Sequence, residues 1–392
     1  MRILYGYSNC TDATYNRIIS ERNVSVLQPD QKYHGLLIKG LAKNDAEVRC
    51  ISGLPINRAV TSRKLIREKD EQEGNAYFHY ITTLNLPILR QLMIFFGTFF
   101  SVLRAKKDKD TYAICDCLNI ANAYGMTLAC RMRKIPVVSI VTDLPDMERS
   151  SGFLKKINNT LFKKTDTFII LTEQMNERVN HKGKPYIVLE GHVDSEASVS
   201  EDQTPYEIAT GKKVIMYAGS LKRIYGIDYL VEGFIKANIA DSELRVYGDG
   251  DFREELETLS EKYPNVRYMG IKSNQEIVTE EQKASLLVNP RPIAPEYTKY
   301  SFPSKNMEYM VSGTPMLTTK LPGMPSEYYP YVYLIEDETP TGIAETLNNI
   351  FAEPFEKRKD KAKQARSFVL EHKSNVVQAS KIIKFFETEL SL

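Results

Sequence analysis

The chain has 392 residues, of which 42% are hydrophobic, and 52 Lys and Arg against 50 Asp and Glu leave a net charge of +2. This length suffices for two domains, each with a sizeable core. The near balance of charge argues against a general nucleic-acid binder, which would carry an excess of basic residues. The five cysteines are scattered and include no second close pair, so they indicate buried free thiols in a reducing cytoplasm rather than a zinc site.

In the first half of the chain, stretches typical of strands alternate with stretches typical of helices. Strands are predicted over residues 2–5, 47–52, 77–82, 111–117, 136–141 and 167–171. Helices are predicted over residues 32–44, 86–106, 121–133, 153–164 and 173–180. This alternation implies parallel β-α-β units with helices on both faces of the sheet. The opening residues form too short an apolar run for a signal peptide.

Residues 92–103, LMIFFGTFFSVL, form the most apolar stretch of the chain and run into Arg104, Lys106, Lys107 and Lys109. The run is shorter than the roughly 20 residues that span a bilayer. A helix of the protein core is one interpretation. The alternative is a helix lying in a membrane surface, with the basic residues on anionic headgroups. On that interpretation, residues 84–109 make a peripheral membrane contact.

The segment 196–211 is polar, acidic and rich in small residues, so we expect it to link two domains, 1–195 and 212–375. The second domain repeats the alternation of strands and helices. Strands are predicted over residues 214–218, 244–247, 266–269, 285–289 and 316–318 and near residue 332, and helices over residues 227–237, 252–263, 275–283 and 303–312 and from residue 341 onward. We expect an α/β protein of two doubly wound domains with a cleft between them.

The helix predicted at residues 303–312 carries the strongest chemical signal. Proline suits its first turn, and Gly313 suits its end. The first turn presents free N–H groups at the positive end of the helix dipole, beside Ser304 and Lys305. A cation at a helix N-terminus favours an anion, and Glu308 one turn later can accept bonds from sugar hydroxyls. These features suit a nucleoside-diphosphate sugar, whereas the alternative is an ordinary surface helix.

Residues 301–315, SFPSKNMEYMVSGTP, resemble family four of the retaining glycosyltransferases, which have the GT-B fold, and are most similar to members that build bacterial surface polysaccharides. The resemblance implies two Rossmann-like domains facing an interdomain cleft, with the acceptor on the N-terminal domain and the nucleotide sugar on the C-terminal one. It also implies that a final helix, within residues 376–392, crosses back to the first domain.

The turn after the strand at residues 214–218 supplies further candidate donor-binding residues, Gly219, Ser220, Lys222 and Arg223. A turn of small residues lets backbone N–H groups approach phosphate oxygens. The resembled family has Arg and Lys where this chain has Ser220 and Tyr225. We therefore expect Lys222, Arg223 and Lys305 to share the diphosphate, and Lys222 and Lys305 to stabilise the leaving group. A solvated basic turn is the alternative.

Other donor contacts follow from the resemblance. Gly248 lies in a G-x-G turn that faces the nucleotide, and Ile271 lies at the strand end where the family places the base. Glu308 matches the glutamate that binds the ribose. The family's first glutamate falls at Tyr300, so the Tyr300 hydroxyl is expected to hold the donor sugar instead, and a partly impaired site is the alternative. The neighbouring Ser301 is a further candidate donor-binding residue.

In the first domain, Asp143 follows a buried strand and matches a motif that faces the transferred sugar in the resembled family, with Thr142 in place of a histidine. Asp143 is expected to accept the proton of the acceptor or to orient the donor sugar. An N-cap or loop carboxylate is the alternative. His34 is a weaker candidate, and His192 is expected to shape the hinge.

The expected activity is therefore transfer of a sugar from a nucleotide sugar to a polysaccharide or lipid-linked acceptor, with retention and without metal or other cofactor. Cations and helix dipoles can stabilise the leaving diphosphate in place of a metal. The expected location is cytoplasmic, at the inner face of the membrane. Two alternatives stay open: a non-catalytic nucleotide-sugar-binding partner, and a nucleotide-sugar 2-epimerase, which would need carboxylates around the sugar.

Overall fold

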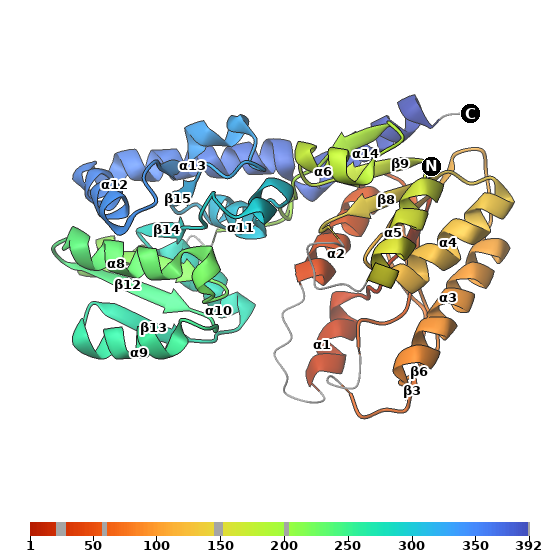
Figure 1. The fold of residues 1–392 in the computed structure, drawn as a ribbon, viewed down its shortest axis with the longest axis horizontal. Coiled ribbons are helices and arrows are strands. Elements are labelled where there is room, and N and C mark those ends of the chain that lie inside the picture. The colour runs from red at the N-terminus through yellow and green to blue at the C-terminus, as the bar shows by residue number, and fades with distance from the viewer. Residues whose placement is uncertain (21–28, 57–60, 145–151, 200–203, 391–392) are drawn as a thin grey trace. The chain divides into compact units, whose positions relative to one another are not determined.

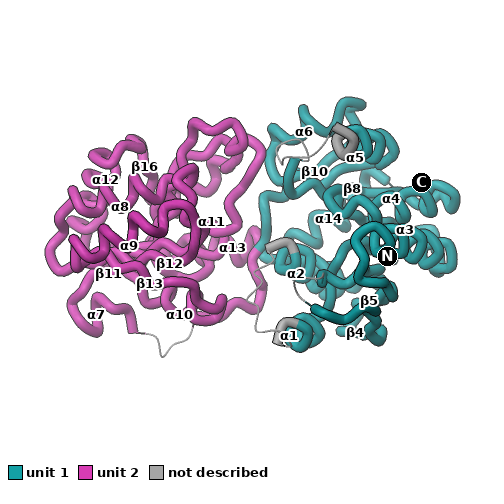
Figure 2. The backbone as a smooth tube through the Cα atoms, turned by 60° about the horizontal axis from the view of Figure 1, so that its bottom comes forward, with its two compact units in different colours: residues 1–192, 374–392 teal, residues 193–373 magenta. Residues whose placement is uncertain are grey.

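The computed structural model describes residues 1–20, 29–56, 61–144, 152–199 and 204–390. The backbone contacts divide the chain into two compact units, coloured separately in Figure 2. Unit 1 comprises residues 1–192 and 374–392, and unit 2 comprises residues 193–373.

The described residues of unit 1 form one large sheet with the strand order β10-β9-β8-β7-β1-β2-β5-β4. Neighbouring strands are parallel, except for β4 and β5 at one edge. The strands are β1 (Arg2–Gly6), β2 (Glu47–Ser52), β4 (Glu71–Glu73), β5 (Ala76–Tyr80), β7 (Thr111–Asp116), β8 (Val137–Val141), β9 (Thr167–Ile170) and β10 (Tyr186–Val188). A short antiparallel pair, β3 (Leu65–Ile66) and β6 (Thr83–Leu84), lies outside this sheet.

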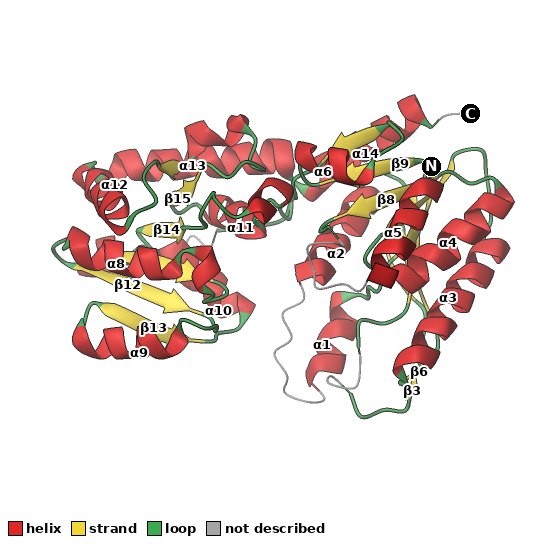
Figure 3. Ribbon diagram, in the orientation of Figure 1, coloured by secondary structure: helices red, strands yellow, loops and turns green. Residues whose placement is uncertain are grey.

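Helices cover both faces of the sheet of unit 1 (Figure 3). They are α1 (Asp12–Ser20), α2 (Pro29–Lys43), α3 (Pro87–Arg104), α4 (Ile120–Arg133), α5 (Gly152–Lys164), α6 (Glu173–Val179) and α14 (Asn375–Glu389). Strand β1 shows how the faces are divided. Its Ile3 and Tyr5 join the core under α2 and α14, whereas a Cβ on Gly6 would collide with Asn122 and Met126 of α4.

Helix α14 belongs to unit 1 although it is the last element of the chain. It packs against α2, where Gly40 lets the two backbones approach so closely that a Cβ would lie 2.2 Å from the carbonyl oxygen of Asn375. Phe386 is fully buried and its ring lies 5.1 Å from that of Tyr112 on β7. The core of unit 1 is therefore complete only when the last helix is present.

Helices α3 and α4 run side by side on the other face of the sheet (Figure 1). Gly125 allows this close packing, since a Cβ there would lie 2.4 Å from the carbonyl oxygen of Phe95. Within the described residues, α3 is the one helix long and apolar enough to cross a membrane by length and composition, and 17% of it is buried. Its buried side chains, including Ile94 and Val102, lie on one face. The expected apolar helix thus buries one face and exposes the other.

In unit 2, the described strands form a parallel sheet with the order β13-β12-β11-β14-β15-β16. The strands are β11 (Lys213–Ala218), β12 (Ser242–Tyr247), β13 (Val266–Gly270), β14 (Leu286–Asn289), β15 (Met316–Thr319) and β16 (Tyr333–Ile335). The helices are α7 (Tyr206–Thr210), α8 (Ile227–Ala237), α9 (Arg253–Lys262), α10 (Asn274–Lys283), α11 (Ser304–Ser312), α12 (Pro340–Ala352) and α13 (Phe355–Lys373). Short 3-10 turns, η1 (Arg223–Tyr225), η2 (Glu296–Tyr300) and η3 (Ser326–Tyr331), connect them.

Strand β11 is buried between the two helical layers of unit 2. Its residues Ile215 and Tyr217 face the core formed with α8 and α12, and Val214 and Met216 face the core formed with α11 and α13. Two parallel sheets, each wrapped by helices, confirm the predicted α/β class.

The structure adds elements that the sequence pattern did not reveal. Helix α1 was not predicted, because it is short and carries only a weak apolar stripe. Part of the segment expected to be a linker forms α7, where Glu207 makes an ion pair with the buried Arg358 at 2.7 Å. That interaction attaches residues 206–210 to unit 2.

The role of α14 in the core of unit 1 can be tested by replacing Phe386 with Ala. Removing a fully buried aromatic side chain costs about 3–5 kcal/mol. We expect faster amide hydrogen exchange in β1 and α2, with unit 2 unaffected. Exchange measured by mass spectrometry checks this, with exposed Lys384→Ala as the control. Equal protection of β1 and α2 in the two variants would contradict the assignment of α14 to this core.

Candidate functional site

In the sheet of unit 2, the side on which successive strands are added changes between β11 and β14. From β11, the chain builds β12 and β13 on one side, and then β14, β15 and β16 on the other. In open parallel sheets, ligands bind outside the carboxyl ends of the strands at such a reversal. The loops that follow β11, β12 and β14 meet there, so this edge of the sheet is the candidate site.

Two glycines allow these loops to touch. Gly248 has φ +131°, and a Cβ on it would lie 1.8 Å from the carbonyl oxygen of Gly219. Gly226 has φ +74°, and a Cβ on it would lie 2.4 Å from the carbonyl oxygen of Pro290. Both positions need a residue without a side chain, for conformation and for space. The predicted residues Gly219 and Gly248 are thus in contact.

The turn after β11 is held by backbone hydrogen bonds from Gly219 to Tyr247 (3.0 Å) and from Leu221 to Asp249 (2.9 Å). The Tyr217 hydroxyl donates to the carbonyl oxygen of Ser220 at 2.7 Å. The side chains of Ser220 and Lys222 are exposed. In the described part of the chain, no hydrogen bond or ion pair engages the ammonium of Lys222, so its charge is available to a ligand.

Arg223 is engaged differently. Its guanidinium makes ion pairs with Glu255 and, at 3.6 Å, with Asp228, and lies over the ring of Phe252 at 4.8 Å. Its backbone N–H donates to Asp251 at 2.9 Å. Two carboxylates therefore balance the charge of Arg223, which reduces what this residue can offer to a diphosphate.

Helix α11 begins at Ser304, as the sequence predicted within one residue, with Pro303 as its N-cap. Among the described residues, no side chain caps this terminus. The N–H of Asn306 donates to the carbonyl oxygen of Pro303 at 3.0 Å, and the N–H groups of Ser304 and Lys305 before it are left for another acceptor. Two hydrogen bonds attach the helix to the strand ends. Asn289 donates to Asn306 at 2.6 Å, and the Tyr309 hydroxyl accepts from the backbone N–H of Ala218 at 3.0 Å. The helix N-terminus is thereby attached to the ends of β14 and β11.

Lys305 lies between two carboxylates. Its ammonium is 2.8 Å from Glu308 and 3.8 Å from Glu281, and Glu281 is 2% exposed. Burial disfavours the charged ammonium, but the two carboxylates outweigh it and raise the pKa of Lys305. Glu281 was not predicted, because it lies on α10 and reaches the site only through the fold. The cluster of Lys305, Glu308 and Glu281 carries a formal charge of −1.

The remaining predicted residues border the same edge. Ile271 follows β13 and is 58% exposed. Tyr300 ends η2, and Ser301 precedes α11 with a buried hydroxyl for which the described residues provide no hydrogen-bond partner. Arg291, which the sequence analysis passed over, follows β14 between two prolines. The signal that could have identified it is a cation placed directly after a buried strand.

In unit 1, Asp143 follows β8 and is exposed. Next to it, the Thr142 hydroxyl donates to the buried Asp116 at 3.3 Å, and Asp116 lies 3.1 Å from His34. His34 is fully buried. It is therefore part of the core rather than a ligand-contacting residue. For His192, burial lowers the pKa to about 4.

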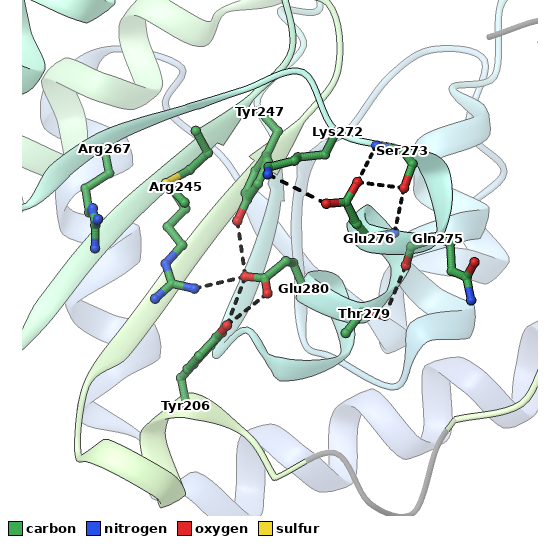
Figure 4. A pocket seen from close by; sticks show the side chains of 11 residues that line it. Tyr206, Arg245, Tyr247, Arg267, Lys272, Ser273, Gln275, Glu276, Thr279 and Glu280 are labelled. Carbon is green, nitrogen blue, oxygen red and sulfur yellow. Dashed lines mark hydrogen bonds and ion pairs between the residues drawn. The ribbon is translucent and has the colours of Figure 1, made fainter. Parts of the chain in front are cut away.

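A cavity of about 430 Å³ lies between α10 and strands β12 and β13 (Figure 4). Glu280 is at its centre and accepts hydrogen bonds from Tyr206 (2.9 Å), Tyr247 (3.1 Å) and Arg245 (2.9 Å). Since these polar groups satisfy one another, we assign no ligand to this cavity. Among the described residues, no group of three or more His, Cys, Asp or Glu side chains is arranged to hold a metal.

Comparison with known proteins gives a consistent picture. Residues 198–368, nearly all of unit 2, match the family described as Glycosyl transferases group 1. No curated protein matches the chain significantly.

Several solved structures have the same fold over the full length. HepE from Anabaena, in complex with UDP, has a TM-score of 0.67 at 14% identity, with 99% of this chain and 100% of that one covered. Sucrose-phosphate synthase from Thermosynechococcus elongatus has a TM-score of 0.68 at 13% identity, with 99% of each chain covered. The lipopolysaccharide outer core galactosyltransferase WaaB has a TM-score of 0.60 at 14% identity, with 99% of each covered. The residues of unit 2 therefore match the glycosyl transferases group 1 family, and the whole chain has the GT-B fold of known glycosyltransferase structures.

Proposed function

We propose that the chain transfers a sugar from a nucleoside-diphosphate sugar to a polysaccharide or lipid-linked saccharide, with retention and without a metal ion. The observation that carries the proposal is the uncapped N-terminus of α11, held against the glycine turn after β11. Backbone N–H groups from a helix N-terminus and from a small-residue turn are suited to a diphosphate. HepE was solved with UDP, so we propose UDP sugars as the first donors to test.

In the proposed reaction, the hydroxyl oxygen of the acceptor forms a bond to the anomeric carbon while the bond from that carbon to the diphosphate oxygen breaks. The electron pair of the broken bond stays on the diphosphate. The proton of the acceptor passes to the departing phosphate oxygen or to Asp143. The N–H groups of α11, together with Lys222 and Lys305, stabilise the charge that develops on the diphosphate, which is the role a metal ion plays elsewhere.

We propose that unit 1 contributes the acceptor side and rests on a membrane through α3 and α4. Ile88, Leu92, Phe96 and Phe100 recur every four residues along α3 and are 46–79% exposed. Leu128 and Met132 of α4 are also exposed, at 41% and 65%. Arg104 ends α3, and the basic residues Lys106, Lys107 and Lys109 follow it. An apolar stripe that ends in basic residues suits an anionic lipid surface and places the enzyme where a lipid-linked acceptor would be.

Lys305→Ala tests the donor site. We expect UDP to bind about tenfold to a hundredfold more weakly, the usual effect of losing a charge-assisted hydrogen bond. Calorimetry measures this affinity, and Lys357→Ala, on the exposed side of α13, is the matched control.

The Lys305 variant also leaves Glu281 buried beside one fewer cation, which can lower stability. Combining Lys305→Ala with Glu281→Gln removes that charge, so weak binding should persist in a protein of restored stability. Wild-type affinity in both variants would exclude Lys305 from the donor site.

Phe96→Glu tests the membrane contact. A carboxylate in the middle of the apolar stripe should reduce cosedimentation with vesicles containing phosphatidylglycerol by about tenfold or more, because it removes apolar burial and adds repulsion. Ile208→Glu in unit 2, 59% exposed in the wild type, is the control. If wild-type protein fails to sediment with these vesicles, or if Phe96→Glu sediments as well as wild type, the contact is refuted.

A further inference from the structure

The charges at the candidate donor site do not balance a diphosphate. Of the three cations that the sequence suggested, Arg223 is paired with Glu255 and Asp228, and Lys305 with Glu308 and the buried Glu281. Of these three, Lys222 alone has no ion pair with the described residues, and it is exposed to solvent. A leaving group with two or three negative charges therefore requires another positive group at this edge of the sheet.

Arg291 is located where such a group is needed. It lies two residues after the end of β14, on the side of the reversal opposite to the glycine turn of β11. Pro290 and Pro292 flank it and restrict the backbone. Its carbonyl oxygen accepts a hydrogen bond from Thr319 at 2.6 Å, and the preceding carbonyl lies against Gly226. The backbone of Arg291 is thus fixed beside the loop that carries Lys222.

Two tyrosines hold the side chain of Arg291. Its guanidinium carbon lies 4.7 Å from the ring centre of Tyr225 and 5.7 Å from that of Tyr297. The two rings are T-shaped, with centres 6.4 Å apart. Arg291 also affects a third ring: burial raises the pKa of Tyr217, and Arg291 acts in the opposite direction. The guanidinium therefore lies over two aromatic rings, an environment that favours Arg over Lys.

Within the residues that the structure describes, no hydrogen bond uses the donors of this guanidinium. The Nε atom is buried and has no hydrogen-bond partner, and no ion pair engages the group anywhere in the described ranges. An unsatisfied buried donor costs free energy unless a ligand completes it. A guanidinium held by aromatic rings keeps its N–H groups for a ligand, and two of these groups can bind two phosphate oxygens together.

We propose that Arg291, stacked on Tyr225 and Tyr297, binds the diphosphate of the donor and neutralises it as the sugar leaves. This inference rests on the proposed function. It explains why Tyr225 occupies a position where the resembled family has a lysine: the tyrosine holds an arginine that comes from another strand. Tyr225 and Tyr297 are then positioning residues, and Arg291 makes the contact.

Arg291→Gln removes the charge and retains much of the shape of the side chain. We expect its affinity for UDP and for inorganic pyrophosphate to fall about tenfold or more, whereas its affinity for uridine changes less than about twofold. Arg291→Lys keeps the charge but loses the planar guanidinium. Its affinity for UDP should therefore lie between those of the wild type and of Arg291→Gln. Arg267→Gln, at the exposed edge strand β13, is the control.

A second variant keeps the test decisive if Arg291→Gln is unstable. Tyr225→Lys combined with Arg291→Gln returns a cation to the same place from the other loop, and it should recover a measurable part of the affinity for UDP.

The outcomes separate the two proposals. If the wild type binds no nucleoside diphosphate, the proposed function fails, and this inference fails with it. If the wild type binds UDP and Arg291→Gln binds it equally well, the donor site stands and the inference is overturned. A parallel loss of affinity for UDP and uridine would also overturn it, since that pattern indicates a general disruption of the site rather than a lost phosphate contact.

Discussion

The site in unit 2 depends on the close contact of three loops at the point where the parallel sheet reverses its order. Gly248 lies against Gly219, and Gly226 lies against Pro290, each at a distance that no side chain would permit. These contacts bring the ends of β11, β12 and β14 to one place, and the hydrogen bond of Tyr309 to Ala218 attaches the N-terminus of α11 to the same edge. Backbone N–H groups and cations from separated segments of the chain are thereby concentrated in a small space.

The charged side chains at this edge of the sheet form ion pairs that largely balance one another. Two of the cations that the sequence analysis predicted at the diphosphate, Lys305 and Arg223, are each accompanied by two carboxylates. Before a ligand binds, these pairs keep the region from accumulating unbalanced positive charge. On the proposed function, a diphosphate would compete with Glu308 for Lys305, and the freed carboxylate of Glu308 would become available to the hydroxyls of a ribose. The exchange of one anion for another makes binding depend on the whole set of charges rather than on one residue.

Unit 1 has a well-packed core on one face of its sheet and exposed apolar side chains on the helices of the other face. Helix α14 closes one face of its sheet through Phe386 and the close approach at Gly40. On the other face, Gly125 lets α4 pack tightly against α3, so that Ile94 and Val102 are buried while Phe96 and Phe100 remain exposed. Large exposed apolar side chains in regular spacing are unusual on a folded domain and generally indicate a surface that contacts something else.

Much of this architecture could be predicted from local patterns. The alternation of strands and helices indicated the α/β class, and the boundaries of α8 and α11 agree with the prediction to within one residue. Helix α11, whose N-terminus has no side-chain cap, could be predicted from the segment around Lys305. The proline before the helix, the glycine after it and the charged residues within it are features of the sequence itself. Helix α1 and the attachment of α7 through Arg358 were not predicted, since the first has weak periodicity and the second depends on a partner 151 residues away.

The sequence by itself determined which segments fold into strands and helices, and it identified the glycine turn and the helix that suit a phosphate. These are local properties, set by neighbouring residues along the chain. Only the tertiary structure decided how charge is distributed at the site. Glu281 reaches Lys305 from α10, and Arg291 reaches Tyr225 from the far side of the sheet reversal. The order of the strands in the sheet brings these distant residues together. The residues next to each of them in the sequence therefore do not predict the contact.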